Sequence, residues 1–139
     1  YKKQIIELKL KGLKKIFFNK KIPRDHLIKK LTDFDFGYVA WQNVPLYNYG
    51  VSGQKYYDYM ACGLPILSAS NKIKDSVYKF GCGLQIENTP KAIENAILKI
   101  SKMKRGNLRL MGKKGLDQIE NYTYEVLAKK YLIIFNNFE

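Results

Sequence analysis

The chain has few of the residues that most metal and redox sites need. Its 139 residues include one histidine and two cysteines, and Cys62 and Cys82 show neither metal-ligand nor redox spacing. We therefore expect reduced thiols in a cytoplasmic protein, with Cys62 packing near a helix end. His26 falls in the first turns of a predicted helix, and we interpret it as a surface residue. No apolar run in the sequence reaches the length of a membrane span.

Acidic residues are also scarce, with 12 against 25 lysines and arginines and a formal net charge of +13. A basic chain suggests nucleic-acid binding. However, the lysines outnumber the arginines 22 to 3 and are scattered over every predicted helix, whereas phosphate recognition favours arginine forks. We therefore expect a solvated surface and no nucleic-acid partner. The same surface would be attracted to anionic lipids, by about 1 kcal/mol per well-placed lysine.

The most informative stretch is Gly50–Ala69, with the sequence GVSGQKYYDYMACGLPILSA. It predicts a glycine-flanked loop, a helix over Ser52–Cys62 and a short buried strand over Pro65–Ala69. Ser52 is the expected N-cap of the helix, and Gly63 supplies the left-handed stop before the proline.

Lys55 then falls at the third helical position, where a capping box would place Glu or Gln. A lysine there opposes the helix dipole at a cost of roughly 0.3–1 kcal/mol. Asp58 lies one turn later on the same face. One interpretation is a solvated lysine and a surface ion pair. The other is that Lys55 and the free helix amides hold a diphosphate, while Asp58 accepts hydrogen bonds from sugar hydroxyls.

Strands and helices alternate along the chain after Tyr1–Leu10, which has helical spacing. The predicted strands are Lys15–Phe18, Phe36–Trp41, Pro65–Ala69 and Leu84–Glu87. The predicted helices are Pro23–Leu31, Ser52–Cys62, Ile73–Phe80, Thr89–Met103, Asn107–Asn121 and Thr123–Asn136. This alternation predicts a single α/β domain over residues 1–139, with a Rossmann-like parallel sheet and helices on both faces. Ligands would bind beyond the carboxyl ends of the strands, where the long loop Gln42–Val51 lies.

The segment YGVSxxKxxDYMAxGxPI resembles the donor-site helix of glycosyltransferase family 4, the retaining enzymes of GT-B fold. It looks closest to the bacterial branch that builds cell-surface polysaccharides. Supporting matches are FDFGYVAWQNVPLYNYG before it, and KFGCGLQIEN and NYTYEVLAKKY after it. The resemblance covers essentially the whole chain, as the carboxyl-terminal nucleotide-sugar-binding domain. It implies metal-independent transfer from a nucleotide-diphosphate sugar, with UDP as the expected nucleotide, to a saccharide or lipid-linked acceptor.

The resemblance assigns catalytic roles to two residues. Lys55 corresponds to the donor-site lysine, and Asp58 takes the place of the acidic residue that contacts the nucleotide ribose. The family's arginine partner to the lysine has no match in the sequence. A further family glutamate falls at Gly50, so we expect the backbone there to contact the donor sugar. The expected substrate-binding residues are Tyr49, Gly50, Val51, Ser52 and Gly53, with Ile22 near the base.

Judged against the family's topology, two leading strands are missing. They would lie between Lys15–Phe18 and Phe36–Trp41, at the middle of the sheet, and a sheet without its centre exposes edges. We therefore expect the chain to be a fragment whose amino-terminal acceptor domain is absent. Alone, it should bind nucleotide weakly at best.

Several other patterns imitate functional motifs. Asp33-Phe34-Asp35 resembles a metal-binding DxD, but it precedes a strand and so lies at the amino end of the sheet; we expect no metal and no cofactor. Asn121-Tyr122-Thr123 matches a glycosylation acceptor, although a helix junction capped by Thr123 explains it better. Tyr56 and Tyr59 are expected to pack the helix on the sheet.

Two other functions stay open at this point. A nucleotide-sugar epimerase of the same architecture would need acid and base side chains that this chain has few of. A degenerate, non-catalytic transferase domain would bind partners or anionic surfaces. The expected location is the cytoplasm, with peripheral contact at the inner face of the cell membrane.

Overall fold

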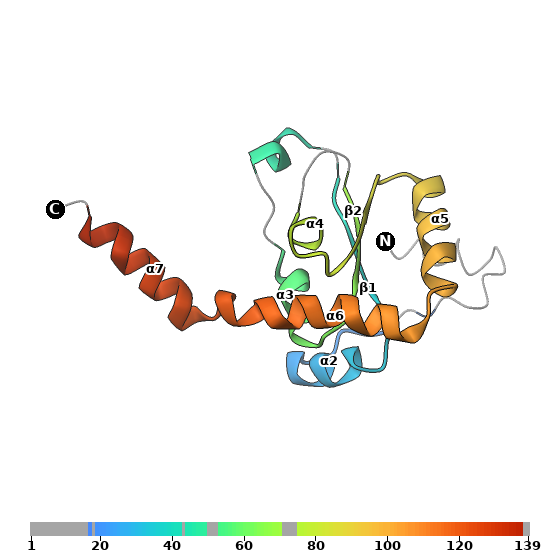
Figure 1. Ribbon diagram of the computed structural model, residues 1–139, viewed down its shortest axis with the longest axis horizontal. Helices are drawn as coiled ribbons and strands as arrows, with labels where there is room; N and C mark the ends of the chain where they lie inside the picture. Colours follow the sequence, from blue (N-terminus) through green and yellow to red (C-terminus); the bar gives the residue numbers. More distant parts are fainter. Residues whose placement is uncertain (1–16, 18, 43, 50–52, 71–74, 138–139) are drawn as a thin grey trace.

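The computed structural model describes residues 17, 19–42, 44–49, 53–70 and 75–137 (Figure 1). The described part has a three-stranded parallel sheet in the order β1-β2-β3. Its strands are β1 (Gly37–Ala40), β2 (Ile66–Ala69) and β3 (Gly83–Ile86). The predicted α/β class with a parallel sheet is confirmed. The predicted strand Lys15–Phe18 and helical segment Tyr1–Leu10 lie outside the described residues, apart from Phe17, which is not in a strand.

Six α-helices accompany the sheet in the described part of the chain. They are α2 (Arg24–Leu31), α3 (Gln54–Ala61), α4 (Ser76–Phe80), α5 (Pro90–Ser101), α6 (Arg105–Ile119) and α7 (Tyr124–Asn136). There are also two short 3-10 helices: η1 (Pro45–Tyr49) lies between β1 and α3, and η2 (Glu120–Tyr122) lies between α6 and α7. The predicted bounds agree to within about two residues except at the start of α4. The prediction began that helix at Ile73, whereas the observed N-cap is Asp75.

The sheet is centred on β2, whose four residues are all buried. In the register of the sheet, Gly37 of β1 lies opposite Ile66, which lies opposite Gly83 of β3. A Cβ atom at Gly83 would overlap the Ile66 carbonyl, so the close approach of the two strands requires glycine there.

Helices cover both faces of the sheet, as predicted. On one face, Ile66 packs with Tyr56 and Met60 of α3 and with Val77 of α4. On the other face, the neighbouring residue Leu67 packs with Ala96 and Ile100 of α5. Ile66 and Leu67 belong to different clusters because successive side chains of a strand point to opposite faces of the sheet. Tyr56 and Tyr59 therefore pack α3 on the sheet, as the sequence predicted.

Helix α6 approaches the rest of the domain through glycine. A Cβ atom on Gly112 would lie 1.8 Å from the carbonyl oxygen of Gly63, and one on Gly115 would lie 3.2 Å from Cβ of Cys82. Gly63 has a φ of 61° and ends α3 in the left-handed conformation that the sequence predicted. The contact brings the backbone of α6 directly against the turn between α3 and β2.

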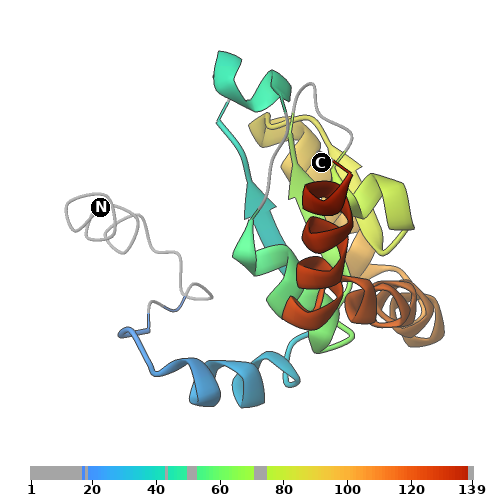
Figure 2. The ribbon, with the colours of Figure 1, turned by 90° about the vertical axis from the view of Figure 1, so that its left-hand side faces the viewer.

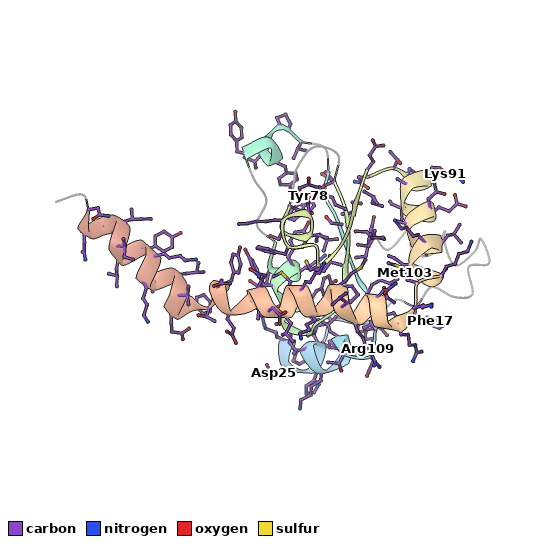
Figure 3. All side chains as sticks on the ribbon, viewed as in Figure 1. Phe17, Asp25, Tyr78, Lys91, Met103 and Arg109 are labelled. Atoms are coloured by element: carbon purple, nitrogen blue, oxygen red, sulfur yellow. The ribbon has the colours of Figure 1, made fainter. Side chains whose placement is uncertain are left out.

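Helix α7 extends away from the body of the domain (Figure 1). It contains no buried residue, and its side chains radiate from the helix on all sides (Figure 3). Its exposed large apolar residues include Tyr131, Leu132, Ile133, Ile134 and Phe135. None of the described helices is both long and apolar enough to cross a membrane.

Candidate functional site

Helix α3 begins at the carboxyl end of β1. Trp41 directly follows β1, and its backbone N–H donates to the carbonyl of Ala69, at the end of β2. A Cβ atom on Gly53 would lie 2.9 Å from the Trp41 ring, so the start of α3 lies against that ring. The loop between β1 and α3 contains η1, which lies at the opposite end of the molecule from α2 (Figure 2). The start of α3 and η1 therefore lie at the carboxyl ends of the strands, which is the edge at which open α/β sheets bind ligands.

The N-cap of α3 differs from the prediction. The cap residue is Gly53, in an extended conformation with no side-chain cap, and the helix begins at Gln54. The prediction of Ser52 as N-cap was wrong, and Lys55 occupies the second helical position instead of the third. Gly53 lies close to the Trp41 ring at this position, where an added Cβ atom would be 2.9 Å from the ring. Ser52 itself lies outside the described residues, as do Gly50 and Val51.

The carboxylate of Asp58 pairs with an arginine of α2. The Arg24 Nη2 atom lies 2.5 Å from Asp58 Oδ1, and Gln54 Nε2 donates to the same oxygen at 3.3 Å. The Asp58 side chain is 13% exposed and that of Arg24 is 61% exposed. The interpretation of Lys55 and Asp58 as a surface ion pair is therefore wrong, because the partner of Asp58 is Arg24. Lys55 is exposed on α3, and the structure does not bring it to Asp58.

Arg24 is a site residue that the sequence analysis missed, since no arginine was expected here. One signal could have identified it. Arg24 is one of only three arginines beside 22 lysines, and it begins a helix immediately after the loop that ends at Ile22. A planar guanidinium suits a carboxylate better than an ammonium does. An arginine among the few of a lysine-rich chain is thus a candidate for a specific ion pair.

A cavity of about 570 Å³ opens beside this ion pair. Three tyrosine rings and one leucine form most of its wall, together with two polar side chains from α2 and α3. The lining residues are Arg24, Gln54, Tyr57, Tyr122, Tyr124 and Leu127. The rings of Tyr57 and Tyr122 are 5.2 Å apart between centroids, and burial raises the pKa of the Tyr122 hydroxyl. Such a wall can accommodate a flat ring while the polar groups bind hydroxyls or phosphate.

A buried polar network lies behind the start of α3. The Tyr56 hydroxyl donates to Asp75 Oδ2 at 2.7 Å and lies 2.9 Å from Ser68 Oγ. Ser68 also donates to Asp75, and Trp41 Nε1 donates to the Tyr56 hydroxyl. Burial raises the pKa of Tyr56 far above its usual range. The hydroxyl therefore stays protonated and acts as a donor to the carboxylate.

Asp75 also caps α4, because its other oxygen accepts the first free amides of that helix. Oδ1 accepts from the backbone N–H of Val77 at 2.9 Å and of Tyr78 at 3.2 Å. Asp75 is 4% exposed. Asp75 is a residue that the sequence prediction lacked, although aspartate is among the preferred N-cap residues.

Two further predicted substrate contacts fall in the described residues. Tyr49 is 92% exposed at the end of η1, so the structure does not bring it to α3. Its neighbour Tyr47 packs edge-on against the Trp41 ring, with centroids 5.1 Å apart. Ile22 is half-buried in the segment that leads into α2, two residues before Arg24.

The acidic pair that imitates a DxD motif lies at the amino end of β1, as predicted. Asp33 and Asp35 line a second cavity, of about 370 Å³, together with Arg105 and Arg109 of α6; Figure 3 labels Arg109. No group of three or more potential metal ligands occurs among the described residues.

The remaining candidates have the environments that the sequence suggested. His26 is exposed on α2. Cys62 is half-buried, with its Sγ 3.8 Å from the carbonyl of Ile28, and both cysteines are free. Cys82 is fully buried, and this burial raises the pKa of its thiol to about 11. Thr123 caps α7 by accepting from the Val126 amide at 3.3 Å, so the predicted helix junction is confirmed.

Comparisons of the chain with protein-family models, with curated proteins and with solved structures found no match. A function for this site therefore has to be argued from its residues and their geometry.

Proposed function

We propose that the chain is the donor-binding domain of a retaining glycosyltransferase, and that its donor is a nucleotide-diphosphate sugar, with UDP as the nucleotide. The observation that carries the proposal is the position of α3. This helix starts at the carboxyl ends of β1 and β2, its N-cap Gly53 offers no capping side chain, and it bears Lys55 in its first turn. The motif resemblance around Lys55 and Asp58 concerns this same helix.

In this proposal the first turn of α3 binds the diphosphate. The amides of Gln54 and Lys55 precede the first intrahelical bond, which Tyr56 N–H makes to the Gly53 carbonyl at 2.9 Å. Gly53 has no side chain to accept from them. Free amides, the helix dipole and an adjacent ammonium together favour an anion. Charge grows on the departing diphosphate as the glycosidic bond breaks, and Lys55 would stabilise it electrostatically.

The nucleoside would occupy the side of α3 that faces α2. Asp58 lies one turn below Lys55, and Arg24 and Gln54 both hold its Oδ1 atom. A carboxylate fixed in this way is oriented to accept from a ribose hydroxyl without rearrangement. The adjacent cavity has tyrosine rings that can stack a base. Ile22, where the family resemblance places base contacts, immediately precedes the Pro23-Arg24 start of α2.

The remaining parts of the reaction are assigned to groups outside this domain. The transition state would be oxocarbenium-like. The acceptor, a saccharide or lipid-linked sugar in surface-polysaccharide synthesis, would be bound by an amino-terminal domain, together with any general base. The proposal needs neither a metal nor another cofactor. It places the enzyme in the cytoplasm, with its basic surface in peripheral contact with anionic lipids of the inner membrane face.

Sugar transfer by the enzyme joined to its amino-terminal domain tests the proposal. Lys55→Ala and Asp58→Ala should each lower kcat/KM by at least tenfold, while Lys91→Ala and Glu94→Ala, which break an exposed ion pair on α5, serve as matched controls. Near-normal transfer by both site variants would discard the assignment. Incubation with the donor alone distinguishes the alternative of an epimerase, because epimerisation requires no acceptor. Nucleotide-insensitive binding to liposomes, with no transfer, would favour a non-catalytic domain.

A further inference from the structure

The buried polar network joins four elements around the start of α3. Trp41 follows β1, Tyr56 belongs to α3, Ser68 to β2, and Asp75 begins α4. Every member is hydrogen-bonded to another member of the network. Among the described residues, no buried side-chain nitrogen or oxygen atom lacks a partner. The network is therefore complete, and each hydroxyl or carboxylate in it has a defined orientation.

The network holds the first turn of α3 at two residues, Tyr56 and Gly53. Tyr56 follows Lys55 directly in the chain, and its hydroxyl is tied to Asp75 behind the helix. The Trp41 ring also stacks on Tyr56, with centroids 6.0 Å apart, and lies against Gly53. The direction of the Gln54 and Lys55 amides thus depends on where the Trp41 ring and the Tyr56 hydroxyl lie.

Stability alone does not require such a network. Apolar side chains of similar volume at buried polar positions often give equal or greater stability. What a carboxylate with two side-chain and two backbone donors adds is a unique arrangement, since each donor must point at a defined atom. The arrangement here fixes the helix start that the proposed function assigns to the diphosphate.

We propose that Tyr56 and Asp75 are positioning residues that aim the first amides of α3, and Lys55 with them, at the bound diphosphate. The inference rests on the proposed function. It adds that the affinity for a nucleoside diphosphate is set by the carboxylate of Asp75, which acts through the Tyr56 hydroxyl and the Trp41 ring. Tyr56 and Asp75 need not touch the ligand.

The chain offers a direct probe, because Trp41 is its only tryptophan. A ¹H–¹⁵N NMR spectrum therefore contains one indole N–H signal, which reports the bond from Trp41 to the Tyr56 hydroxyl. Tyr56→Phe removes the hydroxyl and keeps the ring. Asp75→Asn keeps a good N-cap for α4 and removes the charged acceptor. Tyr131→Phe, on the exposed surface of α7, removes a hydroxyl without touching the network.

The experiment titrates each folded protein with UDP while following the indole signal and the amides of residues 53–55. We expect the indole signal and these amides to shift in Tyr56→Phe and Asp75→Asn before any ligand is added. UDP should bind these variants about tenfold more weakly than the wild type, a difference of about 1.4 kcal/mol. The Tyr131→Phe control should behave as the wild type.

The outcomes separate the two proposals. Equal UDP affinity in the wild type, Tyr56→Phe and Asp75→Asn would overturn the positioning inference and leave the donor site standing. Because the chain alone should bind nucleotide weakly, the titration extends to high UDP concentration, and absence of binding to the wild-type chain even there would count against the proposed function. In that case unshifted amides at residues 53–55 in Tyr56→Phe would overturn the positioning inference as well, whereas shifted amides would support its structural part. If Tyr56→Phe does not fold, Ser68→Ala, which removes a different donor to Asp75, provides the same comparison.

Discussion

Arg24 and Asp58, 34 residues apart in the chain, form an ion pair that ties α2 to α3. The pair is one of the few attachments of α2 to the domain, since Leu31 is the one buried residue of this helix. The pair places an arginine beside the carboxylate for which the motif resemblance implies a ribose contact.

Substitution of Arg24 should affect ligand binding more than stability. We expect Arg24→Ala to lower the free energy of unfolding by no more than about 1 kcal/mol, because the guanidinium is 61% exposed and exposed ion pairs contribute little. UDP affinity should fall several-fold, since Asp58 loses the group that orients it. Urea denaturation and calorimetric titration measure the two effects, with Arg105→Ala as the control. A loss above about 2 kcal/mol would show that the pair is mainly structural.

Gly53 should tolerate no side chain. The Cβ atom of Gly53→Ala would lie 2.9 Å from the Trp41 ring, so the ring or the helix start has to move. We expect a loss of about 1–3 kcal/mol in the free energy of unfolding and a change in Trp41 fluorescence. Gly106→Ala, with no atom within 4 Å of the added Cβ, is the matched control and should be neutral or slightly stabilising. Equal stability of the two variants in urea would contradict the observed packing.

The two cysteines should differ in reactivity, and Cys82 should affect the free energy of unfolding at high pH. Cys62 is half-buried and should react with iodoacetamide in the folded protein, whereas Cys82 should react only after unfolding. The folded pKa of Cys82 is about 11, above its ordinary value of 9. Its contribution to stability is therefore complete below about pH 9 and is lost as the pH rises toward 11. The stability of Cys82→Ala should fall less steeply over this interval, and parallel pH profiles would refute the assignment.

Removal of α7 should cost little stability. The helix contains no buried residue, so a chain ending at Thr123 should lose less than about 1 kcal/mol in the free energy of unfolding. Leu67→Ala, at a fully buried position of the central strand, should by contrast lose about 2–5 kcal/mol. Thermal and urea unfolding compare the three proteins. A truncated chain as unstable as Leu67→Ala would mean that α7 packs on the domain in solution.

The sequence predicted the elements of the fold where local chemistry determines them. Apolar runs located the strands to within a residue, and the cap at Thr123 was correct because a threonine oxygen satisfies the amide three residues further on. The stop at Gly63 followed from glycine's access to positive φ. These features depend on neighbours in the chain.

The features that the sequence did not predict depend on contacts between distant residues. Serine is the better N-cap residue, but the observed cap is Gly53, which lies against the ring of Trp41, twelve residues earlier in the chain. Asp58 could pair with Lys55 by helical spacing, yet its partner comes from α2. The role of Asp75 depends on Tyr56 and Ser68, which β2 and α3 bring to it only in the folded chain.

The contact of Gly112 with the Gly63 carbonyl has a consequence for motion. Because the two backbones touch without an intervening side chain, the last turn of α3 and the middle of α6 have no room to slide past each other. The far end of α3 is held by contacts of another kind, the hydrogen bonds of the buried polar network and the Trp41 ring, and among the described residues no backbone-to-backbone contact locks it in place. A conformational change on donor binding would thus pivot about the Gly63 turn, with the largest displacement at Gly53.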